Sequence, residues 1–151
     1  MLGSFVTKPP ISYEWFYANG RNQFWPIMQE VYRLELKTKK QKQELFVKLK
    51  MALADIILSC ERRNNSNLDM ILFNITNNTQ VIKDILTKNK IKKIFFTSRY
   101  VESLFGKVFK DVNQVTNEIE LIYLPSPSPR YAAMSREEKI ERYKELLPKL
   151  N

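Results

Sequence analysis

Hydrophobic residues recur at helical spacing in five stretches of the chain. Apolar side chains three and four positions apart line one face of a helix, so each stretch predicts a helix with one buried face. The last helix is the best marked, because Ser135 and Glu138 form a capping-box pattern at its start. The residues expected on the buried faces are Ile27, Met28, Val31, Tyr32 and Leu36; Leu45, Phe46, Leu49 and Leu53; Val81, Ile82, Ile85 and Leu86; Val101, Leu104, Phe105, Val108 and Phe109; and Ile140, Tyr143, Leu147 and Leu150.

Short apolar runs between these stretches predict strands. Residues 93–97 and 119–124 are compact runs of the kind found in buried parallel strands. Residues 1–5 are expected to form a short strand that ends before Pro9 and Pro10, because proline donates no ladder hydrogen bond. Residues 54–60 fit a strand or an extended loop, whereas residues 37–42 and 62–67 are interpreted as polar connections.

The order of these elements predicts the fold class. Strands and helices alternate, which favours an α/β fold whose parallel sheet is covered by helices on both faces. Such sheets collect ligands beyond the carboxyl ends of their strands. Phe5, Ser98 and Leu124 lie at the ends of predicted strands, so we expect all three at one edge of the sheet. At 151 residues the chain is expected to form a single domain, 1–151.

Composition excludes several classes of protein. With 44% hydrophobic and 27% charged residues, global disorder is excluded. No apolar run approaches the roughly 20 residues that span a bilayer. The first residues lack the basic and apolar regions of a signal peptide, so we expect a cytoplasmic protein.

The reactive side chains narrow the chemistry further. One cysteine, Cys60, excludes an internal disulfide and a cysteine-ligated metal centre. The chain has no histidine, which excludes serine–histidine, cysteine–histidine and histidine–metal mechanisms. The net charge of +9 favours a polyanionic partner, because surface cations release counterions from nucleic acid.

Two segments near opposite ends of the chain carry the clearest motifs. The first is Gly3-Ser4-Phe5 with the later run Phe16-Tyr17-Ala18-Asn19-Gly20-Arg21-Asn22-Gln23-Phe24-Trp25. The second is Leu124-Pro125-Ser126-Pro127-Ser128-Pro129, in which each proline restricts the residue before it to extended conformations. Aromatic faces can stack on a base that has left the duplex, and serines in a stiff loop can contact phosphates.

In order and separation, these motifs resemble those of the uracil-DNA glycosylase superfamily, and most closely its hypoxanthine-DNA (deoxyinosine) glycosylase branch. Members of that branch typically read G-S-F-P-S, F-Y-Y-x-x-P-x-N-R-F-W and L-P-S-T-S-P. The chain departs from these patterns at Val6, where members of the branch carry Pro. It also departs at Arg130-Tyr131, where members carry Ala-Asn, and it has Leu124 where some other branches of the superfamily have His. The resemblance implies a three-layer α/β/α sandwich around a mostly parallel four-stranded sheet. It also implies a monofunctional DNA repair glycosylase, which hydrolyses the N-glycosidic bond of hypoxanthine or uracil flipped out of DNA.

The resemblance also implies roles for single residues. Asn22 is the catalytic candidate, positioning water or binding the base edge, although an asparagine here equally fits a helix N-cap. No metal or cofactor is expected. The expected base pocket comprises Gly3, Ser4, Phe5, Phe16, Tyr17 and Ser98, with Phe24 and Trp25 in the core. The expected DNA contacts are Ser126, Pro127, Ser128, Arg130 and Tyr131.

Other interpretations of these residues stay open. Asp55 and the Ser59-Cys60-Glu61-Arg62 stretch are similar to the family's middle segment, but a salt bridge from Asp55 or Asp69 to Arg62 explains them as well. The whole chain also fits a non-catalytic nucleic-acid-binding member of the same fold, or an enzyme that acts on free nucleotides or nucleosides. The expected partner is DNA that contains deaminated bases, bound by a monomer with no membrane attachment.

Overall fold

The computed structural model describes residues 1–5, 15–62, 72–110 and 118–150. The chain packs into two compact units. Unit 1 comprises Met1–Thr7 and Leu53–Tyr123, and unit 2 comprises Lys8–Ala52 and Leu124–Asn151. The single domain expected over residues 1–151 stays a prediction.

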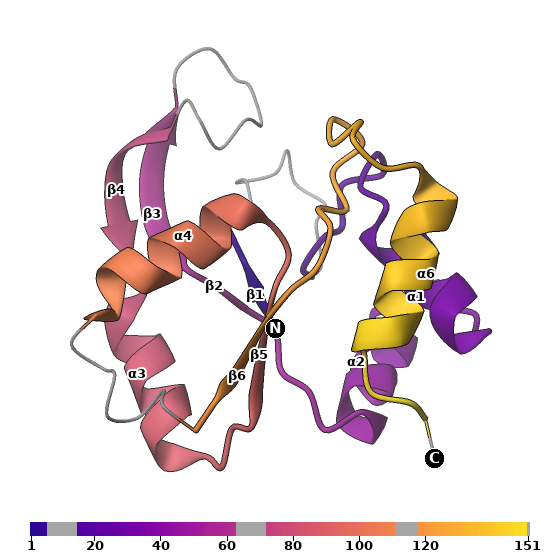
Figure 1. Cartoon of the computed structure of the whole chain (residues 1–151), viewed down its shortest axis with the longest axis horizontal. Helices are drawn as coiled ribbons and strands as arrows, with labels where there is room; N and C mark the ends of the chain where they lie inside the picture. Colours follow the sequence, from indigo (N-terminus) through magenta and orange to yellow (C-terminus); the bar gives the residue numbers. More distant parts are fainter. Residues whose placement is uncertain (6–14, 63–71, 111–117, 151) are drawn as a thin grey trace. The chain divides into compact units, whose positions relative to one another are not determined.

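Unit 1 contains the central sheet (Figure 1). Its four strands are β1 (Leu2–Gly3), β2 (Ala54–Asp55), β5 (Lys93–Phe96) and β6 (Glu120–Tyr123), in the order β2-β1-β5-β6. Every neighbouring pair is parallel. The α/β fold class, with a central parallel four-stranded sheet flanked by helices, is therefore confirmed.

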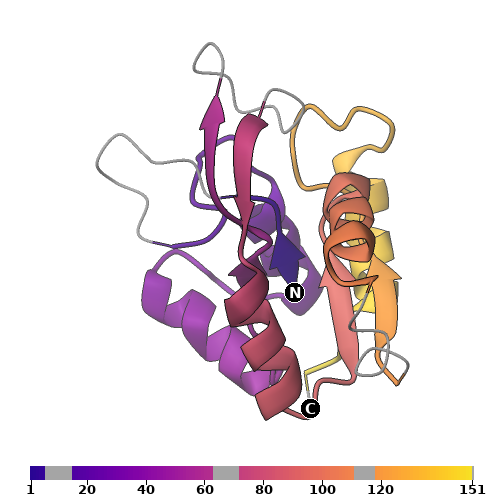
Figure 2. The same cartoon turned by 90° about the vertical axis from the view of Figure 1, so that its left-hand side faces the viewer.

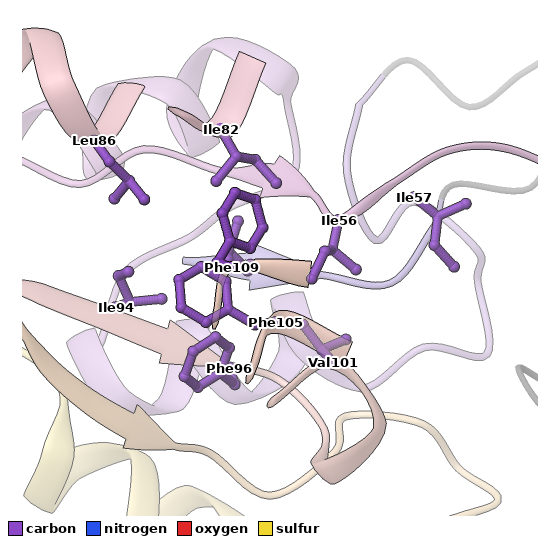
Figure 3. Close-up of a cluster of buried hydrophobic side chains, with 10 residues drawn as sticks. Ile56, Ile57, Ile82, Leu86, Ile94, Phe96, Val101, Phe105 and Phe109 are labelled. Carbon is purple, nitrogen blue, oxygen red and sulfur yellow. The ribbon is translucent and has the colours of Figure 1, made fainter. Parts of the chain in front are cut away.

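Two amphipathic helices, α3 (Thr79–Lys88) and α4 (Arg99–Val108), pack against one face of this sheet. Both helices were predicted from their apolar spacing, but Val81, which was expected on the buried face of α3, is 50% exposed. They share one hydrophobic cluster with Ile94 and Phe96, which lie two positions apart on β5 and so point to the same face (Figure 3). Phe95 points to the opposite face and is also only 4% exposed.

A second, smaller sheet was only partly predicted. Residues 54–60 were expected to be strand or extended loop, and they form β2 and the start of β3 (Ile57–Arg62). No pattern predicted β4 (Leu72–Asn77), which pairs antiparallel with β3 in a register interrupted by two irregularities (Figure 2). Within the turn predicted at residues 62–67, residues 63–67 lie outside the described residues.

Unit 2 is helical. Its helices are α1 (Phe24–Tyr32), α2 (Lys39–Lys48) and α6 (Arg136–Leu146). The connection predicted at residues 37–42 is wrong from Lys39 onward. The reason is that Thr38 and Gln41 form a capping box, which starts α2 inside the lysine-rich run.

The ends of two predicted helices are also corrected. Arg33 adopts a left-handed conformation (φ 51°) that ends α1, so Leu36 is buried outside the helix. Leu53 likewise lies beyond the end of α2. The capping box that starts α6 is confirmed, and so is the burial of Tyr143 and Leu147. Ile140 and Leu150, also expected on the buried face, are half-buried.

The core of unit 2 is aromatic. Phe24 and Trp25 are 0% and 5% exposed, so their predicted place in the core is confirmed. Trp15 stacks on Trp25 with ring centroids 5.5 Å apart, and Phe46 meets the edge of this pair. Such pairs add about 0.5–1.5 kcal/mol each to the burial of the rings themselves. These ring contacts hold the segment before α1 in place. That segment contains the candidate site residues Phe16, Tyr17 and Asn22.

Candidate functional site

The strands β1, β5 and β6 end at the same level of the sheet. Leu2 is paired with Phe96, and Phe96 with Tyr123, so the three parallel strands share one carboxyl edge. Ser4 and Ser98 follow this edge closely in the chain, and Leu124 directly follows β6. The predicted convergence of the strand ends is confirmed.

The residues after β1 and β5 make local structural contacts. The carbonyl of Gly3 accepts a hydrogen bond from Ile56 N–H (2.9 Å) and that of Ser4 from Ile57 N–H (3.0 Å). Phe5 is half-buried against the hydrophobic cluster of unit 1. The part that these residues play in a base pocket stays a prediction.

Ser98 is a helix cap. Its Oγ accepts a hydrogen bond from the Val101 N–H at 3.2 Å, at the start of α4. A hydroxyl that accepts this bond still has its own proton to donate, so capping and ligand binding are compatible. Sequence reasoning placed Ser98 at a strand end but missed the cap.

In unit 2, Asn22 lies at the start of α1 and is tied to it. Its Oδ1 accepts a hydrogen bond from the Phe24 N–H (2.9 Å), and its own N–H donates to the Asn19 carbonyl (2.8 Å). The N-cap position of α1 is Gln23, so the expected N-cap role of Asn22 is replaced by this bond to the first N–H of the helix from one residue earlier. Within the residues that the structure describes, the Nδ2 group of Asn22 has no hydrogen-bond partner. One end of the amide orients the side chain, and the other end can donate to a ligand.

The aromatic residues before Asn22 are held by α1. Trp25 Nε1–H donates to the Phe16 carbonyl (2.8 Å), and the Tyr17 ring stacks on Phe24 with centroids 4.1 Å apart. Tyr17 also has a positive φ of 56°, which costs a non-glycine residue about 1–2 kcal/mol. Because Phe24 covers one face of the Tyr17 ring, that face is closed to a base.

The structure brings the two sequence motifs together. The Gln23 N–H donates to the Pro127 carbonyl at 2.9 Å, within unit 2. Standard bond lengths then limit the Cα separation of Asn22 and Ser126 to about 12 Å at most. Residues that are more than a hundred positions apart in the sequence thus lie close together, as we expected. That they form one functional site stays a prediction.

The serine–proline loop, residues 126–131, is held by bonds from its own serine side chains, by the Tyr131 N–H bond to the Ser128 carbonyl (3.1 Å), and by bonds from outside the loop. Ser126 Oγ accepts from the Ser128 N–H, and Ser128 Oγ accepts from the Arg130 N–H, both at 3.3 Å. The amides of Ser128 and Arg130 are therefore already engaged, which leaves the hydroxyl protons for a phosphate. Just before the loop, the buried Tyr143 hydroxyl donates to the Pro125 carbonyl at 2.9 Å. Arg130 is exposed and Tyr131 is half-buried.

Lys139 was missed by sequence reasoning. Its side chain is 1% exposed, and its Nζ donates to Gln23 Oε1 (2.9 Å) and to the Ser128 carbonyl (3.3 Å). The ammonium also lies 5.3 Å from the centroid of the Tyr131 ring. Burial lowers the pKa of Lys139 below its ordinary value. Its position four residues before Tyr143 on α6 was the available signal, since that spacing places both on one helix face.

Other expected features are limited by what the structure describes. Asp69 and the side chain of Arg62 lie outside the described residues, as do the contacts expected of them. Among the described residues, no three His, Cys, Asp or Glu side chains are grouped closely enough to hold a metal ion. In the same part of the chain, no helix has the length and apolarity needed to cross a membrane.

Comparisons with protein-family models, with curated proteins and with solved structures give no match to this chain.

Proposed function

We propose that this protein is a DNA glycosylase of base excision repair, which hydrolyses the N-glycosidic bond of hypoxanthine or uracil flipped out of DNA. The observation that carries the proposal is the hydrogen bond from Gln23 to Pro127. It joins the segment with the catalytic candidate, Asn22, to the loop with the phosphate-binding candidates. A glycosylase needs these two groups next to each other, because the bond to be cut lies between the base and the phosphates.

Asn22 supplies the catalytic contact. As the glycosidic bond breaks, its electrons move to the base, so a donor to the base carbonyl oxygen stabilises the transition state. The Nδ2 group of Asn22 is such a donor, and the bond from Phe24 to Oδ1 keeps it oriented. A water molecule adds to C1′ of the sugar and loses its proton to solvent, and the departing base is protonated in turn. No metal or cofactor takes part.

The serine–proline loop holds the DNA strand. The hydroxyls of Ser126 and Ser128 each keep a proton to donate, and Arg130 adds an exposed positive charge. Because the loop is stiffened by its prolines and internal bonds, little entropy is lost when it binds. We expect Tyr131 to occupy the gap that the flipped nucleotide leaves.

Base release from defined duplexes tests the proposal. Purified protein is incubated with duplexes that contain uracil, hypoxanthine or xanthine, and abasic sites are then cleaved with alkali. We expect cleavage at one or more lesions in wild-type protein and a roughly tenfold to thousandfold loss in Asn22→Ala. Asn19→Ala is the matched control, since Asn19 makes a similar turn contact (Arg21 N–H to Oδ1, 3.0 Å) in the same segment.

Two outcomes would reject the proposal in different ways. Duplex binding without base release would indicate the non-catalytic nucleic-acid-binding protein. Release of base from free deoxyinosine or deoxyuridine, with no activity on duplexes, would indicate the enzyme of free nucleosides.

A further inference from the structure

Lys139 is a buried cation whose hydrogen-bond partners, among the residues that the structure describes, are neutral. Its hydrogen bonds go to an amide oxygen, Gln23 Oε1, and to a backbone carbonyl, that of Ser128. In the described part of the chain, no carboxylate oxygen lies within 4.0 Å of its Nζ. The two other paired cations of α6 differ in this respect, because Arg142 is bonded to Glu145 and Lys144 to Glu141.

The nearest acids in the sequence do not neutralise this charge by contact. Glu137 and Glu138 lie in the first turn of α6 and are exposed. Glu138 accepts a hydrogen bond from the Ser135 N–H at 2.6 Å, in the capping box. Lys139 is also the fourth residue of α6, close to the positive end of the helix dipole. The dipole therefore makes the positive charge of its ammonium less favourable there. Taking an unpaired ammonium out of water is unfavourable, so this arrangement opposes folding.

The position of Lys139 suggests what compensates for that cost. It connects the residue after Asn22 with the middle of the serine–proline loop, on the inner side of that loop. At 1% exposure, the amine is closed to direct attack on a substrate. Its positive charge still acts on an anion bound outside the loop, because Coulomb interactions are weakly screened in a buried site.

We propose that Lys139 is a positioning residue for a phosphodiester-binding subsite at residues 126–131, in which a DNA phosphate offsets its buried charge. The ammonium fixes Gln23 and Ser128 relative to each other, and the Ser126 and Ser128 hydroxyls and Arg130 contact the phosphate. This inference rests on the proposed function, since it assigns the DNA backbone as the ligand.

Binding of a fluorescein-labelled DNA duplex by Lys139→Met, measured by fluorescence anisotropy at several salt concentrations, tests this inference. Lys144→Met is the matched control, because it removes the same charge from the exposed side of the same helix. At low salt we expect at least tenfold weaker binding for Lys139→Met and less than about threefold for Lys144→Met. Lys139→Arg keeps the charge, so it should recover part of the affinity.

Stability serves as a control for this role. Lys139→Met leaves the Gln23 Oε1 and Ser128 carbonyl acceptors without their donor, so the urea midpoint of unfolding is expected to fall. Binding is therefore compared under conditions in which every variant is folded. Equal affinity losses in the two methionine variants, or no recovery of affinity in Lys139→Arg, would overturn the inference.

Failure of the inference and failure of the proposed function can be told apart. If wild-type protein releases no base but Lys139→Met selectively loses duplex binding, the glycosylase assignment is wrong and the subsite stands. If base is released and Lys139→Met binds like Lys144→Met, the subsite is wrong and the glycosylase assignment stands. Absence of duplex binding by wild-type protein rejects both.

Discussion

Asn22 has two separable tasks, and substitution can divide them. The first is structural: its Oδ1 satisfies the Phe24 N–H at the start of α1, while Gln23, which directly precedes that helix, makes no side-chain capping bond. The second is catalytic and uses the Nδ2 group. Asn22→Ala removes both, whereas Asn22→Ser keeps an oxygen that can accept from the same N–H and removes the amide.

The magnitudes follow from these contacts. Losing the cap should lower the free energy of unfolding by about 1 kcal/mol in Asn22→Ala, and by a few tenths in Asn22→Ser. Losing one preorganised donor to the departing base should slow its release by about tenfold to thousandfold in both variants, which is about 1.4–4 kcal/mol of transition-state stabilisation. Stability and activity should therefore separate in the serine variant.

Urea unfolding curves and single-turnover base release measure the two effects on the same protein preparations. Single-turnover conditions are needed because slow product release would hide a change in the chemical step. If Asn22→Ala is less stable yet releases base at the wild-type rate, Asn22 is only a cap. Full recovery of both properties in Asn22→Ser leads to the same conclusion.

Four further predictions concern binding, stability and mechanism. Arg130→Ala should weaken binding to lesion-containing duplex more than to undamaged duplex in anisotropy titrations; equal losses would make Arg130 a general phosphate contact. Tyr143→Phe should lower the free energy of unfolding by about 1–3 kcal/mol, because the Pro125 carbonyl loses its buried donor; an unchanged urea midpoint would contradict this. The Ser135 backbone N–H, and after it the Ser135 side chain, lower the pKa of Glu138 below 4.5. This contribution to stability is present above that pH and is lost as the pH falls through the lowered value. Glu138→Gln should therefore destabilise the protein more at neutral pH than in acid in urea unfolding, and an equal effect at both pH values would contradict this. Base release should show no kinetic pKa near 6.5, because the chain has no histidine. Borohydride should trap no protein–DNA adduct, because the proposed mechanism uses no lysine Schiff base; a trapped adduct would refute the hydrolytic mechanism.

The sequence was most informative where the structure depends on local pattern. The helix around Phe105 and the strand around Phe95 follow from the spacing of apolar residues, and the start of α6 follows from its capping box. The strand β4 has no such signal. Its Asn74 is left-handed (φ 50°), Ile75 is exposed, and its register with β3 is irregular, so the alternation of buried and exposed residues is lost.

The site was predicted in part for a similar reason. The order of the motifs predicted that Asn22 and Ser126 would be close together, but not the atoms that join them. The spacing of Lys139 and Tyr143 places both on one face of α6, but this spacing alone gives no reason to bury a lysine. Its burial depends on Gln23 and the serine–proline loop. Likewise, only the folded loop shows that the Ser128 amide is occupied by a neighbouring hydroxyl.

The stacked indole rings give the protein an intrinsic optical probe. Trp15 and Trp25 are the only tryptophans in the chain, and both belong to unit 2. Their rings stack at an interplanar angle of 18°, and their emission reports on the surroundings of these two rings in unit 2. Unit 1 contains no tryptophan and gives no tryptophan fluorescence, but its sheet contributes to far-ultraviolet circular dichroism. Comparing the two signals during denaturation therefore shows, without any label, whether the units melt as one cooperative body or in succession.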